Sequence, residues 1–270
     1  MTTSYVHGYS GPETRRLSDQ ADTLAALLHG GTRYPAGSRV LEVGCGVGGQ
    51  TVHLLTHSPD ARLVSVDVSA ESLALAKARV AERVPGADVE WRHADLFSLP
   101  FPDESFDHLF VCFVLEHLTA PEKALAHLLR LLRPGGTITV IEGDHGSAIY
   151  HPQSAYAQAA IDCLARLQSD AGGDALIGRR LFPLLDAAGY ADVAVRPCTV
   201  YADPSRPELV EGFTRDTFTA MVEGVGEAVV SRGLIPAGDW ERGIADLCRT
   251  ESGTFHYAFF KATAKRRTEG

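Results

Sequence analysis

Three acidic residues lie at the ends of successive predicted strands, and they are the side chains best placed to bind a ligand. Glu42 comes at the end of the first strand, Asp67 closes the second and Asp95 follows the third. A carboxylate at the position of Asp67 can accept hydrogen bonds from both hydroxyls of a ribose. Asp95 is in position to meet an adenine edge while Leu96 packs on the ring. Any one of these acids could be a helix N-cap or a solvated strand end, but all three together favour a nucleoside site.

A glycine-rich loop follows the first strand and leads into a helix that begins near Gln50. Gly44-x-Gly46-x-x-Gly49 satisfies the dinucleotide fingerprint, so the loop alone does not choose between NAD and another adenosine cofactor. Glu42 precedes the first glycine, where a negative charge would repel a pyrophosphate and attract an ammonium group. The combination favours a nucleoside that carries an amino acid.

The elements that must position these residues alternate short β-branched runs with helical stretches, which is typical of a parallel sheet covered by helices. We expect strands near residues 39–43, 62–67, 89–93, 106–112, 137–142, 192–201 and 254–262. We expect helices near residues 15–29, 48–57, 70–83 and 121–132. Two further stretches, 147–190 and 204–252, read as helical insertions. Such insertions suggest a lid over the carboxyl edge of the sheet, where open α/β sheets bind their ligands.

Composition excludes several classes of partner. The net charge of -9 argues against nucleic acid, because phosphate binding depends on clustered Lys and Arg. Five cysteines are scattered without a CxxC pair or a Cys/His cluster, so we expect neither a disulfide framework nor a metal site. The first residues lack the features of a signal peptide, and no apolar stretch is long enough to span a bilayer. These features predict a cytoplasmic protein with no membrane partner.

Five segments of this sequence resemble successive motifs of the class I S-adenosylmethionine-dependent methyltransferases: VLEVGCGVGGQT, SVDVS, HADLFSLPFPDESFD, VLEHL and LLRPGGTITVIE. They span residues 38–142. The resemblance implies a Rossmann-like α/β fold, with a seven-stranded, mostly parallel sheet, helices on both faces and an antiparallel last strand. It also implies a single methyltransferase domain over residues 1–270. Its parts would be an N-terminal cap (1–37), a cofactor-binding core (38–146) and acceptor-side insertions (147–190 and 204–252).

The same resemblance assigns residues to the cofactor S-adenosyl-L-methionine. Glu42, Gly44, Gly46 and Gly48 would line its methionine end, Asp67 its ribose, and Asp95 with Leu96 its adenine. The remaining residues that we assign to the cofactor site are Gln50, Val68, Phe113, His117 and Tyr5.

The residues that act on the methyl acceptor should lie at the carboxyl ends of the fourth and fifth strands. His145 is the first candidate for a general base, because an imidazole titrates near neutral pH and glycines flank it. Glu116 ends the preceding strand and is a second candidate. Tyr9 is a third catalytic candidate, because a tyrosine could accept the acceptor's proton. It belongs to an aromatic and glycine-containing N-terminal run that could fold over the bound cofactor, where Tyr5 or Tyr9 would face the sulfonium or orient the polar hydrogen of the acceptor.

Further segments are similar to a narrower bacterial group of natural-product C-methyltransferases: YVHGYS, FVCFVLEHL, TITVIEGDHGS, ALIGR and LVEGFTRDTFTAMVEGV. That group includes enzymes that methylate carbon C3 of an indole in tryptophan-derived compounds. The resemblance therefore implies an indole-containing small molecule as the acceptor. By analogy it also implies a homodimer.

Other functions remain open at this stage. O- or N-methylation of another small metabolite would use the same cofactor site. A NAD-dependent oxidoreductase would share the glycine loop and Asp67 but would not require Glu42 or Asp95. A protein that keeps the cofactor fold without catalysis is a further alternative, since a fold does not determine a function.

Overall fold

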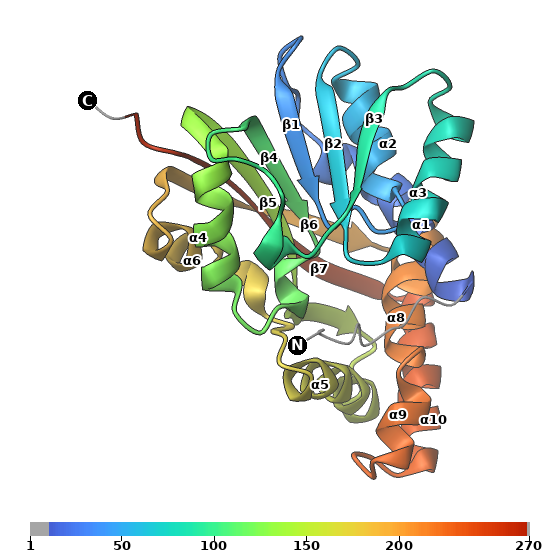
Figure 1. Cartoon of the computed structure of the whole chain (residues 1–270). Coiled ribbons are helices and arrows are strands. Elements are labelled where there is room, and N and C mark those ends of the chain that lie inside the picture. The colour runs from blue at the N-terminus through green and yellow to red at the C-terminus, as the bar shows by residue number, and fades with distance from the viewer. Residues whose placement is uncertain (1–10, 269–270) are drawn as a thin grey trace.

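A computed structural model describes residues 11–268 of the chain, with side chains from Gln20 onward. Its seven strands form one sheet in the order β3-β2-β1-β4-β5-β7-β6 (Figure 1). The strands are β1 (Arg39–Val43), β2 (Arg62–Asp67), β3 (Val89–His93), β4 (Phe106–Cys112), β5 (Leu132–His151), β6 (Ala191–Ala202) and β7 (Thr254–Lys265). β7 pairs antiparallel with both β5 and β6, whereas β1 to β5 are mutually parallel. The predicted fold class is therefore confirmed.

Helices cover both faces of the sheet. One apolar cluster joins α1 (Gly11–Leu28) and α2 (Gly49–His57) to the sheet, and α3 (Ala70–Arg83) lies beside them. On the opposite side, α4 (Pro121–Leu131) and α6 (Leu181–Ala187) bury leucines in a second cluster (Figure 1). Each leucine removed from water there contributes about 2 kcal/mol to the driving force for folding. None of the helices within residues 11–268 is both long and apolar enough to cross a bilayer.

β5 is longer than its predicted range of 137–142, and the first insertion does not begin as a helix. Residues 147–151 belong to the strand, and Ile149 and Tyr150 pair with β7. Tyr150 is buried, and its ring stacks on that of Phe255 with centroids 6.3 Å apart. The extension depends on this distant partner strand, because the local sequence carries turn-like glycines.

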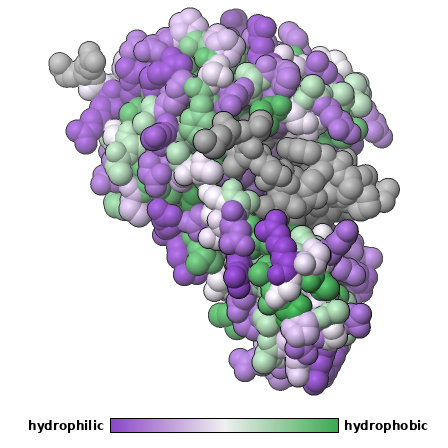
Figure 2. Space-filling model, turned by 60° about the horizontal axis from the view of Figure 1, so that its bottom comes forward, coloured by the Kyte–Doolittle hydropathy of each residue, from purple (hydrophilic) through white to green (hydrophobic). Residues whose placement is uncertain are grey.

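The two insertions meet below the carboxyl edge of the sheet mainly through one helix of each, whereas α6 of the first insertion lies beside α4 (Figure 1). The first contains α5 (Ala155–Asp170) and α6, and the second contains α7 (Pro207–Leu209), the π-helix η4 (Val210–Thr219), α8 (Ala220–Glu223), α9 (Gly226–Ser231) and α10 (Ala237–Cys248). α5 and α10 approach closely, since a Cβ on Gly243 would lie 2.6 Å from the carbonyl oxygen of Tyr156. Figure 2 shows the projecting helices, with apolar side chains interspersed among polar ones.

The end of α1 is tied to β7 by a buried lysine. Lys261 Nζ donates to the carbonyl oxygens of Leu28 at 2.8 Å and Gly30 at 3.1 Å, and to Thr32 Oγ1 at 2.5 Å. An ammonium group at a helix C-terminus is favoured by the free carbonyls and the helix dipole. Desolvation nevertheless lowers the pKa of Lys261 to about 8. This contact helps to hold the end of α1 against the sheet.

Candidate active site

In the glycine loop between β1 and α2, one of three glycines has open space beside its backbone. Gly44, Gly46 and Gly48 all have positive φ angles, of 68°, 52° and 80°. A Cβ on Gly44 would lie 2.6 Å from a methyl of Val114, and one on Gly48 would lie 2.9 Å from the Cα of Ala76. A Cβ on Gly46 would meet nothing within 4 Å. Gly44 and Gly48 are therefore required by packing, whereas Gly46 leaves the space in which a ligand can approach the backbone.

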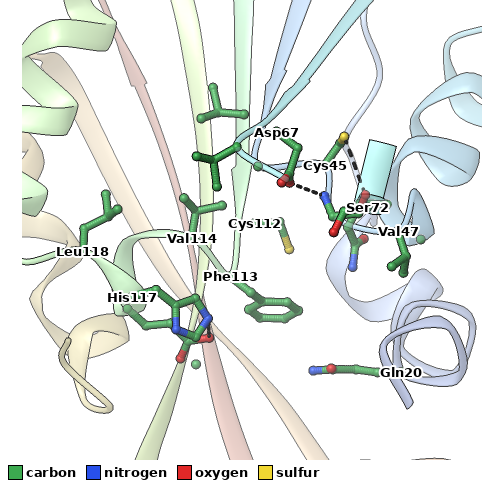
Figure 3. Close-up of a pocket in the computed structure, with 18 of the residues that line it drawn as sticks. Gln20, Cys45, Val47, Asp67, Ser72, Cys112, Phe113, Val114, His117 and Leu118 are labelled. Atoms are coloured by element: carbon green, nitrogen blue, oxygen red, sulfur yellow. Dashed lines mark hydrogen bonds and ion pairs between the residues drawn. The ribbon is translucent and has the colours of Figure 1, made fainter. Parts of the chain in front are cut away.

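Asp67 joins the end of β2 to this loop. Its Oδ2 accepts from the Gly46 amide at 2.8 Å, and its Oδ1 accepts from the Ser69 amide at 2.8 Å. Figure 3 shows the carboxylate pointing toward the loop that carries Cys45. Burial raises the pKa of Asp67 despite these hydrogen bonds. A carboxylate fixed in this way can still accept from ribose hydroxyls on its remaining lone pairs.

A cleft of about 290 Å³ lies beside Asp67 and brings most of the predicted site residues together. Those that line it are Gly44, Gly46, Gln50, Asp67, Val68, Asp95, Leu96, Phe113, Glu116, His117 and His145. Glu42 and Gly48 lie behind its wall. Tyr5 and Tyr9 fall outside the residues that the structure describes.

Glu42 lies beneath the loop rather than on the surface of the cleft. Its Oε2 accepts from Thr51 Oγ1 and Ser65 Oγ, each at 2.7 Å. Its Oε1 is buried and has no partner among the described atoms. Burial raises the pKa of Glu42 to about 7. Because β1 directs this side chain into the sheet's helical cover, Glu42 supports the loop from below and is not among the residues that line the cleft.

Apolar side chains line the part of the cleft next to Asp67. Asp95 Oδ1 accepts from the Phe97 amide at 2.8 Å and so begins a short 3-10 helix, in which Leu96 is buried. Val68 and Phe97 are 52% and 43% exposed, and both line the cleft. Exposed apolar surface beside a buried leucine suits a flat ring. Sequence reasoning missed Phe97, although it directly follows the two residues that we assigned to adenine.

Aromatic side chains enclose the part of the cleft beyond Phe113. Phe113 has a φ of 57° and its ring centroid lies 5.5 Å from that of Phe259. The Tyr257 ring centroid is 5.6 Å from that of Phe213 and 5.5 Å from that of Phe218. We call this space the aromatic chamber, which is formed by Phe113, His145, Phe213, Phe218, Tyr257 and Phe259. In Figure 3, Phe113 and His117 lie across the cleft from Ser72 and Val47.

His145 is held in the aromatic chamber by a buried tyrosine. Its Nδ1 lies 2.7 Å from Tyr257 Oη, and its backbone N–H donates to the carbonyl oxygen of Ala175 at 2.9 Å. Burial, and then the nearby charges of Glu116 and Asp144, raise the pKa of Tyr257, so its phenol stays neutral. Sequence reasoning missed Tyr257, because nothing local distinguishes it from the other aromatic residues of β7.

Two glutamates, Glu116 and Glu142, lie close enough to Tyr257, the partner of His145, to act on its pKa. Glu116 lines the cleft, and its Oε1 is 3.4 Å from His117 Nε2. Glu142 is fully buried, and its Oε1 accepts from the amides of Val114 at 3.1 Å and Leu115 at 2.8 Å. Burial and the charge of Glu116 raise the pKa of Glu142. The protonated form of Glu142 is therefore favoured, whereas Glu116 presents its carboxyl group to the cleft.

Among the residues that the structure describes, no charged residue of the insertions lines the cleft. Arg179 binds Asp144, and Arg215 binds Glu251. The second insertion instead contributes Phe213, Thr217, Phe218 and Met221.

The chain matches known methyltransferases in the region that holds the cofactor cleft. The family described as "Methyltransferase domain" matches residues 41–140. An uncharacterized 37.1 kDa protein in transposon TN4556 of Streptomyces fradiae is 34% identical over 227 residues, which are 82% of this chain and 60% of that protein. The demethylmenaquinone methyltransferase of Thermus thermophilus is 36% identical over 107 residues, which are 40% of this chain and 48% of the relative. The chain thus spans about 60% and about half of the lengths of these relatives.

A solved structure shows the same fold over most of the chain. It is that of Haemonchus contortus phosphoethanolamine N-methyltransferase 2 in complex with phosphomonomethylethanolamine and S-adenosylhomocysteine. Its TM-score is 0.57 at 18% identity, and the match covers 92% of this chain and 53% of that one. The fold is thus Rossmann-like and of the methyltransferase type, and residues 41–140 match a methyltransferase domain. The predictions of a methyltransferase and of its cofactor S-adenosylmethionine are confirmed at the level of this domain.

Proposed function

We propose that this chain transfers a methyl group from S-adenosylmethionine to carbon C3 of an indole in a small, tryptophan-derived natural product. The observation that carries the proposal is the aromatic chamber, which places the paired His145 and Tyr257 beside the cofactor cleft. A flat aromatic acceptor would bury its ring against Phe113, Phe213 and Phe218. Its polar N–H would then find an imidazole or a carboxylate.

The residues of the cleft fit the proposed cofactor. Gly46 leaves the loop backbone open to the ligand, and Asp67 offers lone pairs to ribose hydroxyls. Val68 and Phe97 present apolar surface to an adenine ring. When bound, S-adenosylmethionine supplies an electrophilic methyl group on a sulfonium.

Methyl transfer to an indole requires the protein to perform three tasks. It must align C3 with the methyl carbon, exclude water and accept one proton. The new bond forms from C3 to the methyl carbon as the bond from that carbon to sulfur breaks, and the electron pair of the broken bond stays on sulfur. Positive charge then develops on the indole nitrogen, where loss of its proton to His145 Nε2 relieves it. Nδ1–H of the same ring can donate to Tyr257 Oη, and the charge of Glu116 stabilises the cationic ring.

The electrostatics of the cleft support a neutral acceptor. No Lys or Arg is found among the described residues that line it, whereas Asp67, Asp95 and Glu116 are. A phosphate or carboxylate on the acceptor would therefore lack the cation that usually binds it.

Mass spectrometry of reaction mixtures tests the proposal. The purified chain is incubated with S-adenosylmethionine and indole-containing cyclic dipeptides, and fragmentation locates the added methyl group. We expect methylation on C3 and a loss of about 10²- to 10⁴-fold in kcat for His145→Gln. Products methylated only on hydroxyl or amine groups would favour the alternative, an O- or N-methyltransferase.

The remaining alternatives have direct tests. The match to a methyltransferase domain disfavours a NAD-dependent oxidoreductase, and calorimetry that detected NADH but not S-adenosylhomocysteine would reverse this. A non-catalytic protein would bind the cofactor product and methylate no acceptor. Homodimerisation, which light scattering measures, and a cytoplasmic location remain expectations.

A further inference from the structure

The strand that carries His145 leaves its regular pairing at that residue. Asp144 pairs with Ala258 and Ile149 pairs with His256, so residues 145–148 of β5 stand opposite Tyr257 alone. This bulge directs His145 out of the ladder toward the aromatic chamber. Bulges of this kind often re-aim a side chain beside an active site.

Side chains within the bulge replace the missing ladder hydrogen bonds. Ser147 Oγ accepts from the Ala258 amide at 2.9 Å and donates to the carbonyl oxygen of Asp144 at 2.6 Å. The Gly146 amide donates to Asp144 Oδ1 at 3.0 Å. Asp144 thus accepts hydrogen bonds from two residues of the bulge, from Gly146 on its carboxylate and from Ser147 on its backbone carbonyl.

The segment Ala175–Arg179, part of the first insertion, clamps the outside of the bulge. The carbonyl oxygen of Ala175 accepts a hydrogen bond from the His145 amide. Gly178 packs closely against the strand, because a Cβ there would lie 2.7 Å from the carbonyl oxygen of Gly143. Arg179 donates from Nε to Asp144 Oδ2 and from Nη2 to Asp144 Oδ1, both at 2.7 Å. The Asp144 side chain is 4% exposed and that of Arg179 is 47% exposed. A buried carboxylate that lost this bidentate partner would be strongly destabilised in its present position.

We infer that Arg179 is a positioning residue: by binding Asp144 it holds the bulge in the form that directs His145 into the aromatic chamber. The functional part of this inference rests on the proposed role of His145 as the base. Arg179 itself does not line the cleft. The first insertion would thereby control the geometry of the base from outside the pocket.

The test compares Arg179→Met with a matched control at the next residue. Arg180 has a similarly exposed side chain, at 48%, and also forms ion pairs, but its partners are Asp174 and Glu122. We expect Arg179→Met to lower kcat about 10- to 100-fold, as misplacement of a catalytic group by about 1 Å can do. The affinity for S-adenosylhomocysteine and the KM for the cofactor should change less than about twofold, and Arg180→Met should leave kcat near the wild-type value.

A double-mutant cycle separates positioning from general damage to the fold. In the His145→Gln background, Arg179→Met should lower kcat less than about twofold further, because the group that it positions is already absent. If Arg179→Met does not fold, the pair Asp144→Asn with Arg179→Gln removes both charges and leaves no buried ion. Equal losses of kcat with and without His145, or equal losses in Arg179→Met and Arg180→Met, would overturn the inference.

A spectroscopic measurement keeps the inference separate from the proposed function. NMR of isotope-labelled histidine, assigned with His145→Gln, reports the hydrogen bond of His145 Nδ1 whatever the acceptor is. Arg179→Met should shift this signal and Arg180→Met should not. A shift in a chain that methylates no indole would reject the proposed reaction and retain the positioning role. An unchanged signal would reject the positioning role in either case.

Discussion

Asp67 and Asp95 both follow strands and both accept backbone hydrogen bonds, but they hold the site to different extents. Asp67 fixes two amides with two oxygens, one of them in the glycine loop, whereas Asp95 uses one oxygen to cap a short helix. In Asp67→Asn, an NH2 group faces one of these two amide donors, and the acceptor for ribose is weakened. We expect the Kd for S-adenosylhomocysteine to rise about 100-fold, since hydrogen bonds to charged groups contribute about 1.5–3 kcal/mol.

Calorimetry measures this effect, with Asp95→Asn as the control. Asp95→Asn keeps a side-chain oxygen for its cap, so the Kd should rise less than about tenfold. Equal losses in the two variants would show that Asp67 has no special role in binding the nucleoside.

The buried Glu42 makes stability depend on pH in a defined direction. Its pKa in the folded protein is about 7, above the ordinary value of 4.5, so the folded state retains a proton that the unfolded state loses. Its stabilising contribution is therefore complete below pH 4.5 and is lost as pH rises through about 7. The free energy of unfolding of Glu42→Gln should exceed that of wild type by up to about 3 kcal/mol at pH 8 and by little at pH 4.5.

Urea unfolding of both proteins at the two pH values checks this expectation. The raised pKa of Glu142 acts in the same direction, but it is common to both proteins and cancels in their difference. A stability difference that did not change with pH would mean that Glu42 titrates normally in the fold.

At the scale of elements, α1 and the π-helix η4 meet where no side chain fits. A Cβ on Gly212 would lie 2.4 Å from Thr23 Oγ1. Gln20 of α1 and Phe213 of η4 line the cleft on either side of this contact. We expect Gly212→Ala to destabilise the fold by about 1–3 kcal/mol and to weaken cofactor binding, because the two helices must separate.

Gly238→Ala in α10 is the matched control for this contact, since a Cβ there would meet nothing within 4 Å. It should be neutral or stabilising by up to about 1 kcal/mol, as alanine is favoured over glycine in a helix. Thermal unfolding measures the stability of both variants, and calorimetry measures how tightly each binds the cofactor. A Gly212→Ala variant as stable as Gly238→Ala would mean that α1 and η4 adapt without cost.

The elements that were predicted well are those whose signals are local. β1 and β2 are apolar runs closed by a glycine or an aspartate, and both have their predicted bounds. The extension of β5 and the bulge at His145 depend on pairing with β7, more than 100 residues away in sequence. The contact between Asp144 and Arg179 spans 35 residues, and the role of Tyr257 follows only from its place opposite the bulge. The residues that we propose for the cofactor could therefore be predicted from sequence motifs, whereas those that we propose for the acceptor are brought together by tertiary contacts.

At the scale of the whole molecule, we expect charge to discriminate among acceptors. The chain carries a net charge of -9, and the described lining of the cleft contains three acids and no Lys or Arg. An acceptor with a carboxylate would enter a negative potential and find no cation in this lining to offset its desolvation. We therefore expect a neutral tryptophan-derived cyclic dipeptide to have a kcat/KM at least about tenfold above that of an analogue bearing a free carboxylate, which corresponds to about 1.4 kcal/mol.

Glu116→Gln and added salt identify the source of this discrimination. Glu116 is the acid of the cleft lining whose charge acts on the aromatic chamber, since it raises the pKa of Tyr257. Removing its charge should narrow the ratio of kcat/KM values between the two acceptors, although it also lowers activity on both. Salt should narrow the ratio only slightly, because a buried carboxylate is screened much less than an exposed one. An acidic analogue that reacted as fast as the neutral one would mean that a cation outside the described lining receives it, and the neutral acceptor would have to be given up.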